Sequence, residues 1–145
     1  MSYVDKNLMT GEHVVARARL HWITFLWSAI WFVVAFVVMV NNGPGGLFLL
    51  LAALAGVSAY ITYSTSEFRL TNKRILVKVG FLKRHSLETL LTKVEGIQVD
   101  QGILGRMLGY GSIVVSGTGG SKEPFHKIAQ PLEFRRKIQE QISNN

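Results

Sequence analysis

The sequence predicts an α+β membrane protein, in which a two-helix transmembrane hairpin is followed by a small antiparallel β-barrel or sandwich that a C-terminal helix caps. Three observations predict this class. Two uncharged apolar runs lie close together in the first half of the chain. Runs of alternating apolar and polar residues follow them, and an apolar stripe at four-residue spacing closes the chain. At 145 residues, the chain has room for about one domain.

The hairpin is predicted from two apolar runs and the turn between them. Residues 22–40 carry no charge, and a helix of about 20 apolar residues can cross a bilayer. The turn Asn-Asn-Gly-Pro-Gly-Gly follows at 41–46, and a second uncharged helix is predicted at 45–63. The remaining chain is too short to bury such a pair in a soluble protein. A cleaved signal peptide would not be followed at once by a second apolar run.

The orientation of the hairpin follows from its charged flanks. Arg17 and Arg19 precede the first span, and Arg69, Lys73 and Arg74 follow the second, whereas the turn carries no charge. By the positive-inside rule, both termini are predicted to lie in the cytoplasm. Apart from tyrosines at the end of the second span, neither span contains an ionisable residue, which argues against a transporter.

The β domain is predicted over residues 64–145 from strand-like alternation. Strands are expected at 67–71, 74–80, 81–86 and 96–102, with a tight turn at 72–73 and Gly80 ending the second run. The cytosolic segment 1–21 also alternates toward its end, where Ala16, Ala18 and Leu20 interleave with arginines. We therefore expect this segment to supply a strand to the same sheet.

The stretch 105–120 holds six of the fourteen glycines and could be either a phosphate-binding loop or a series of turns. It lacks the order of a Walker loop and of a dinucleotide fingerprint, so we interpret the glycines as structural. The apolar residues at 103, 104, 107 and 108 share one face of a helical turn, and Gly109 is expected to end it in a left-handed conformation. Gly111 then leads into a strand, and a return strand follows a turn at 117–121.

The final helix is predicted at 131–143. Pro131 suits its first turn, and Phe134, Ile138 and Ile142 form one apolar stripe. We expect Phe134 and Ile138 to fill the open mouth of the β domain.

Residues for catalysis or metal binding are not evident. The chain has no cysteine, its four histidines lack ligand spacing, and no serine lies in a nucleophile elbow. We therefore expect no catalytic, cofactor-binding or metal-binding residues, no cofactor and no enzymatic activity.

The basic residues are the remaining candidates for a binding surface. The formal net charge is +7, but no nucleic-acid-binding motif is present, so we expect no nucleic-acid partner. Positive charge beside a bilayer attracts anionic lipid, and the alternative is that these charges merely solvate and orient the protein. The candidate membrane-surface contacts are Arg17, Arg19, Arg69, Lys73, Arg74, Lys83 and Arg84.

Over nearly its whole length the chain resembles the second class of bacterial pleckstrin-homology-like (PH-like) membrane proteins. The resemblance rests on LMTGEHVVARARLHW before the hairpin and on the order and spacing of Thr71, Arg74, Gly80 and residues 97–111. It implies a helix-capped PH-like barrel at the membrane and no defined catalytic residues.

These observations together lead to a functional hypothesis. We expect a multi-pass protein of the bacterial inner membrane that acts as a binding or assembly module, an adaptor or scaffold. Its expected partners are the bilayer, anionic lipid head groups held weakly, and a membrane protein or a second copy of the chain. The alternatives are an anionic-lipid or small-ligand sensor, and an accessory subunit of a membrane enzyme or transporter.

Overall fold

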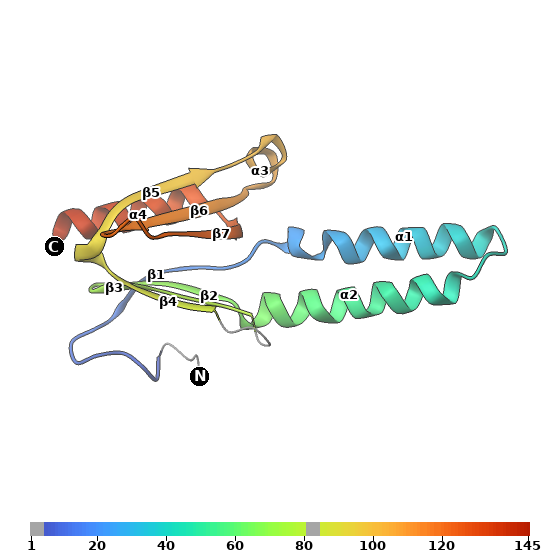
Figure 1. Ribbon diagram of the computed structural model, residues 1–145, viewed down its shortest axis with the longest axis horizontal. Helices are drawn as coiled ribbons and strands as arrows, with labels where there is room; N and C mark the ends of the chain where they lie inside the picture. Colours follow the sequence, from blue (N-terminus) through green and yellow to red (C-terminus); the bar gives the residue numbers. More distant parts are fainter. Residues whose placement is uncertain (1–4, 81–84) are drawn as a thin grey trace.

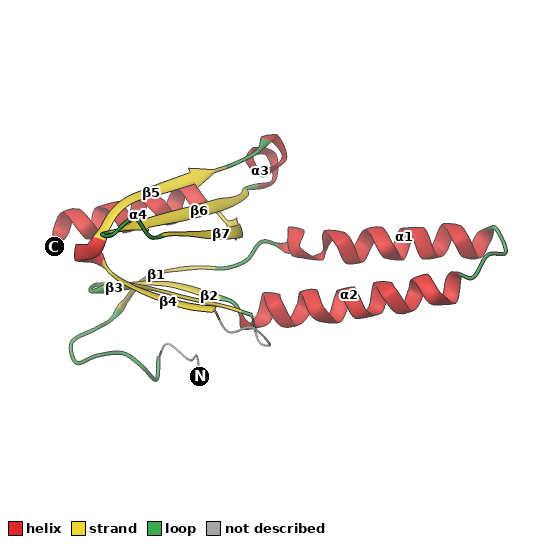
Figure 2. Cartoon of the chain, in the orientation of Figure 1, coloured by secondary structure: helices red, strands yellow, loops and turns green. Residues whose placement is uncertain are grey.

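The chain forms an elongated molecule, with a β domain at one end and a helical hairpin projecting from it (Figure 1). The computed structural model describes residues 5–80 and 85–145. The described strands lie in the β domain together with the C-terminal helix, whereas the hairpin is helical (Figure 2). The α+β class predicted from the sequence is therefore confirmed.

The first sheet has four antiparallel strands in the order β1-β2-β3-β4. They are β1 (Val14–Ala18), β2 (Glu67–Thr71), β3 (Arg74–Val79) and β4 (His85–Leu90). As the alternation predicts, the strand before the hairpin pairs with the strand after it. The strand predicted at 81–86 lies mostly outside the described residues, and β4 extends beyond it.

The second sheet has three antiparallel strands in the order β5-β6-β7. A short 3-10 helix, η2 (Leu91–Lys93), leads from β4 into it. The strands are β5 (Val94–Asp100), β6 (Tyr110–Gly117) and β7 (Lys122–Ala129). The predicted strands and turns of this half of the domain are confirmed.

The two sheets form a sandwich that is joined at one corner, and the described strands do not close into a barrel. After β1 the chain reaches β7, where the Ala129 amide donates to the Arg19 carbonyl at 2.9 Å and the His21 amide donates to the Lys127 carbonyl at 2.7 Å. A bulge in β7, with Lys127 at φ 59°, makes this contact possible. Of the two predicted forms, sandwich and barrel, the closed barrel is wrong, because sheet pairing at this corner is limited to an isolated bridge between Leu20 and Ile128.

The core lies between the sheets and is covered by α4 (Pro131–Asn144). Phe68 of the first sheet meets Phe125 of the second edge to face, with ring centroids 5.9 Å apart. Phe134 and Ile138 of α4 are buried in the same cluster, as the apolar stripe predicts.

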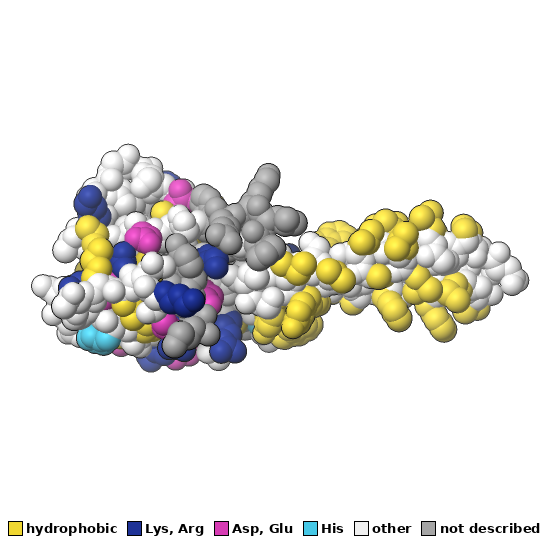
Figure 3. All heavy atoms as spheres, turned by 90° about the horizontal axis from the view of Figure 1, so that it is seen from below, with side chains coloured by type: hydrophobic (Ala, Val, Ile, Leu, Met, Phe, Trp, Pro, Cys, Tyr) yellow, Lys and Arg dark blue, Asp and Glu magenta, His cyan; other side chains and the backbone are white. Residues whose placement is uncertain are grey.

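The hairpin consists of η1 (Trp22–Phe25), α1 (Leu26–Val40) and α2 (Gly45–Thr65). Its two apolar segments have 19 and 21 residues, or about 28 and 31 Å at 1.5 Å per residue, which matches the thickness of a hydrocarbon core. The helices contact through small residues, with Ala35 and Ala52 buried and the Ser28 hydroxyl donating to the Ala52 carbonyl at 3.2 Å. Hydrophobic side chains gather along the hairpin, and charged ones on the β domain (Figure 3).

The helix α3 (Ile103–Leu108) connects β5 to β6. Gly109 ends it at φ 79°, so the predicted left-handed stop is confirmed. Gly80 also has a positive φ, of 80°, at the end of β3. A side chain at Gly111 would collide with the Asp100 carbonyl at 2.8 Å, which explains the absence of one there.

Candidate membrane-proximal binding site

The β domain is fastened to the hairpin by two short connections. Three residues separate β1 from η1, and Ser66 alone separates α2 from β2. At the first connection, Nδ1 of His21 accepts the Ile23 amide at 3.2 Å and so caps η1. The Phe25 and Tyr63 rings then link η1 to α2 at 5.5 Å. The sheets and the hairpin are therefore held together firmly at this junction.

A cavity of about 460 Å³, here called the junction cavity, opens where the hairpin meets both sheets. Its volume lies within the range of about 300–1,000 Å³ that is typical of small-molecule sites. The wall is mainly apolar, and the polar groups are two threonines, a histidine and a lysine. The lining residues are Leu20, Thr24, Thr62, Phe68, Val79, Pro124, Phe125, His126 and Lys127. Such a cavity can accept an apolar side chain or an acyl chain.

A second cavity, here called the basic cavity, lies beside the junction and has a volume of about 220 Å³. Arg17, Arg19 and Arg69 line it together with Tyr63. Arg69 is 8% exposed in its side chain, and its guanidinium binds Asp5 at 2.7 Å, so its charge is largely compensated. The side chains of Arg17 and Arg19 make no hydrogen bond or ion pair within residues 5–80 and 85–145. Two cations therefore remain available to an anion.

The structure separates the other predicted membrane contacts from this site. Lys73 and Arg74 lie at the turn between β2 and β3, at the end of the sheet away from the hairpin (Figure 1). That position does not favour contact with the membrane that the hairpin would occupy. Lys83 and Arg84 lie outside the described residues.

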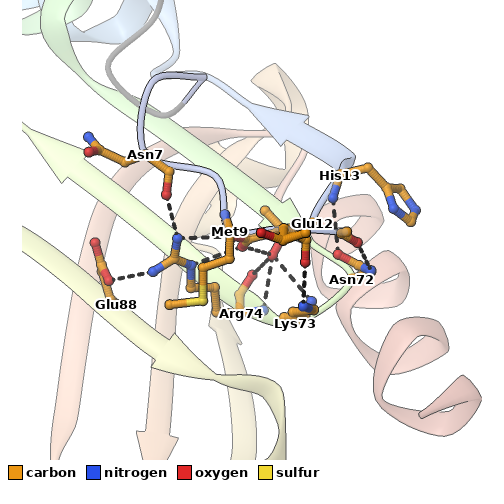
Figure 4. Close-up of polar contacts among 11 residues, drawn as sticks. Asn7, Met9, Glu12, His13, Asn72, Lys73, Arg74 and Glu88 are labelled. Carbon is orange, nitrogen blue, oxygen red and sulfur yellow. Dashed lines mark hydrogen bonds and ion pairs between the residues drawn. The ribbon is translucent and has the colours of Figure 1, made fainter.

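Arg74 is instead the centre of a buried polar network (Figure 4). Its Nε donates to Glu12 Oε1 at 2.9 Å, and a terminal nitrogen donates to Oε2 at 3.0 Å, which is a two-point ion pair. The other terminal nitrogen binds Glu88 at 2.8 Å. The side chains of Arg74 and Glu12 are 7% and 0% exposed. The network fixes the N-terminal segment to β3.

The ionisation of Glu12 reflects these contacts. Burial acts to raise the pKa of the Glu12 carboxyl, but hydrogen bonds from Arg74, the Met9 amide and Thr71, with the charge of Arg74, outweigh it and lower the pKa from 4.5 to about 2. The Glu12 carboxylate raises the pKa of Arg74 in turn. Both groups are therefore charged at neutral pH, and their role is structural.

Sequence reasoning did not find a serine–histidine pair on the second sheet. Ser112 of β6 and His126 of β7 lie 2.9 Å apart between Oγ and Nδ1. His126 is exposed and is also one of the residues that line the junction cavity. Among the residues that the structure describes, no group of three or more His, Cys, Asp or Glu side chains is arranged to hold a metal ion.

The comparisons with known proteins identify the family of this chain. The sequence profile described as "Bacterial PH domain" matches residues 15–142, which run from β1 through the hairpin to α4. The comparison with curated proteins found no match. Because the profile covers well over half of the chain, and two antiparallel sheets with a covering helix agree with the expected PH-like fold, the chain belongs to the bacterial PH domain family.

Proposed function

We propose that the protein is a membrane-anchored adaptor or scaffold of the bacterial inner membrane, whose hairpin crosses the bilayer and whose β domain binds other proteins in the cytoplasm. One observation supports the membrane anchor. Two long uncharged helices, inserted between neighbouring strands of a folded domain, leave their apolar side chains exposed. Only 11% of each span is buried within the chain. A bilayer covers such surfaces, whereas water does not favour their exposure.

The two common alternatives for such helices fit less well. The core helices of a soluble protein are mostly buried, and these are not. A secretion signal is removed together with the residues before it, but here those residues form β1, which pairs with β2. The hairpin is therefore best interpreted as a permanent part of the protein.

The charges favour the cytoplasm as the location of the β domain. Because β1 and β2 are adjacent, both ends of the hairpin emerge on the same side as the β domain. Arg17 and Arg19 lie at that side, whereas the turn 41–44 carries no charge. This asymmetry is the one that the positive-inside rule associates with cytoplasmic flanks.

The outer strand β5 supports a role in protein binding. It forms one edge of the second sheet, and a cavity of about 260 Å³ runs between it and α4. Val94, Gly96 and Ile97 of β5 line this cavity together with Ile142 of α4. An open strand edge beside an apolar groove can accept an extended segment of a partner, with backbone hydrogen bonds to the edge and side chains in the groove.

The second candidate is an anionic-lipid or small-ligand sensor, which the junction cavity and the basic cavity favour. The basic cavity, however, falls below the usual size of a ligand site, and Arg69 is already paired with Asp5. Arg17 and Arg19 alone give an attraction of about 1 kcal/mol each near an anionic surface, with little selectivity. We therefore assign lipid binding a supporting role.

Topology is tested by thiol labelling of intact cells, since the chain has no cysteine of its own. A side chain at Gly46 meets nothing within 4 Å, whereas one at Gly45 would collide with Met39, so Gly46→Cys is the variant for the turn. Thr118→Cys, in the exposed β6–β7 turn, is the variant for the β domain. An impermeant reagent should label Gly46→Cys and spare Thr118→Cys. The reverse pattern would contradict the proposed orientation.

Assembly is tested on protein extracted from native membranes in a mild detergent. The protein should migrate as an oligomer or with a partner, and Gly96→Arg should abolish this by filling the groove beside β5. Gly102→Arg is the matched control, because a side chain meets open space at both glycines. Equal assembly of both variants would show that the edge of β5 is not the binding surface.

Lipid attraction is tested with spin-labelled lipids in reconstituted membranes. The wild type should prefer anionic over zwitterionic lipid, and this preference should fall with added salt and with Arg17→Gln or Arg19→Gln. Lys73→Gln, at the far end of the sheet, should have no effect. A selective preference that survives high salt would favour the sensor.

A further inference from the structure

The helix α3 carries an apolar surface that the fold does not use. Eight large hydrophobic side chains are exposed outside the two spans in the described part of the chain, and four of them belong to the six residues of α3. These four, here called the α3 patch, are Ile103, Leu104, Met107 and Leu108, which are 81%, 62%, 76% and 41% exposed. Ile103 is more exposed than any large hydrophobic residue of the hairpin. A patch of this density marks an interaction surface.

The cause of this exposure is the position of Gly105. Gly105 is the buried residue of α3, and a Cβ atom there would lie 2.5 Å from the Tyr110 carbonyl oxygen. The helix therefore packs against the start of β6 through a residue without a side chain. As a result its large apolar residues point away from the domain. This arrangement is the reverse of a helix that contributes to a core.

The position of α3 relative to the hairpin identifies what covers the patch. α3 lies at the end of the second sheet that faces the hairpin (Figure 1). Tyr110 follows Gly109, the residue that ends α3, and its ring centroid lies 5.2 Å from that of His21. The His21 ring centroid in turn lies 5.1 Å from that of Trp22, the first residue of the first span. α3 is thus held at the depth where the first span begins. Trp22 is itself 57% exposed, as expected of an aromatic residue at a membrane interface.

Charge agrees with this placement. Arg106 of α3 is exposed and follows Gly105, so a cation lies beside the apolar patch. A short segment with exposed apolar residues and a neighbouring arginine suits the boundary between acyl chains and anionic head groups, where apolar faces are buried about 5–10 Å deep. Leu132 of α4, which lines a groove with Arg106, adds a further exposed apolar side chain.

We propose that the α3 patch inserts into the interfacial region of the same bilayer that the hairpin crosses. The protein then has a third membrane contact, to one side of the hairpin. This inference rests on the proposed membrane anchor. With α3 and the hairpin both held by the bilayer, the β domain has a fixed tilt over the membrane and presents its β5 edge in a defined direction.

Single nitroxide labels in the full-length protein test the proposal. Cysteines are placed one at a time at Met107, at Val33 on the exposed face of α1, and at Thr118 in the turn at the other end of β6. The variants are reconstituted in vesicles of phosphatidylethanolamine and phosphatidylglycerol. The surroundings of each label are read by electron spin resonance with two paramagnetic relaxation agents. One is a water-soluble nickel chelate on both sides of the membrane, and the other is carried by lipids near the head group.

We expect the label at Met107 to be several-fold less accessible to the nickel chelate than the label at Thr118, and to be relaxed more strongly by the lipid-borne agent. Nickel access at Met107 equal to that at Thr118, with Val33 shielded, would overturn the proposal and leave the anchor intact. If the label at Met107 is shielded from the nickel chelate but is not relaxed by the lipid-borne agent, the proposal would also be overturned, because a protein surface would then cover the patch. Nickel access at Val33 would instead contradict the membrane anchor itself.

Discussion

The buried ion pair between Glu12 and Arg74 is predicted to make a large contribution to the stability of the β domain. In the variant Glu12→Gln the side chain keeps its shape, but Arg74 loses its buried charged partner and keeps only Glu88, whose side chain is 50% exposed. Breaking a buried pair in this way costs about 3–5 kcal/mol. The contacts that keep Glu12 ionised have a similar total strength, because a pKa lowered from 4.5 to about 2 corresponds to about 3 kcal/mol. Either value is a large share of the roughly 5–15 kcal/mol that stabilises a typical domain.

A matched control is available on α4. Glu140 pairs with Arg136 at 3.5 Å, but these side chains are 62% and 70% exposed. Glu140→Gln should therefore cost no more than about 0.5 kcal/mol. The assay is urea-dependent hydrogen exchange of the full-length protein in a mild detergent, read at the amides of β2 and β3. Equal protection in Glu12→Gln and Glu140→Gln would refute the reasoning.

The same pair predicts how stability depends on pH. The pKa of Glu12 is lower in the folded protein than in the unfolded chain, so its contribution is fully present above about pH 4.5 and is lost as the pH falls toward 2. In that window the wild type should lose about 3 kcal/mol more than Glu12→Gln, which has no carboxyl to protonate at this position. Parallel pH profiles of the two proteins would show that Glu12 is not held ionised by its contacts.

Two further predictions concern the fold. Gly109 has a φ of 79° and open space around it, so Gly109→Ala should destabilise the domain by about 1 kcal/mol or more through backbone strain alone. Gly102 has a φ of −68° and equally open space, so Gly102→Ala should be nearly neutral in the same exchange assay. Ile138 is fully buried, so Ile138→Asp should cost several kcal/mol and Gln139→Asp little; equal melting temperatures of these two variants would mean that α4 does not cover the core.

The parts of the fold that depend on local periodicity could be predicted from the sequence. The spans, the alternating strands and the stripe through Phe134 and Ile138 each repeat within a few residues, and their positions in the structure agree within a residue or two at most ends. The left-handed stop at Gly109 was also local, since it followed from one apolar turn ending in glycine. The sandwich was harder to distinguish from a barrel, because the contact between the two sheets stops at one corner, beside a bulge at Lys127 that no sequence pattern predicts.

The roles of individual charges and apolar residues could not be predicted, because they depend on contacts between distant segments. Arg74 looks like a surface cation beside Lys73, and only the pairing of β1, β2 and β3 brings Glu12 to it. In the sequence, the residues of the α3 patch also resemble a turn that faces the core, because their exposure depends on how α3 packs against β6. Only the close approach of Gly105 to the Tyr110 carbonyl turns that face outward.

The insertion of the hairpin between β1 and β2 determines the order in which the protein can be made. β1 leaves the ribosome before either span, and its neighbour in the sheet leaves after both. If the hairpin crosses a membrane, as we propose, the sheet cannot be completed until both spans have been inserted and the chain has returned to the side on which it started. Until then, β1 has an unpaired edge, and the core lacks every strand that the later chain supplies. On that proposal, a folded β domain implies that both spans have been inserted, whereas a chain with only one span inserted keeps β1 unpaired and open to proteolysis.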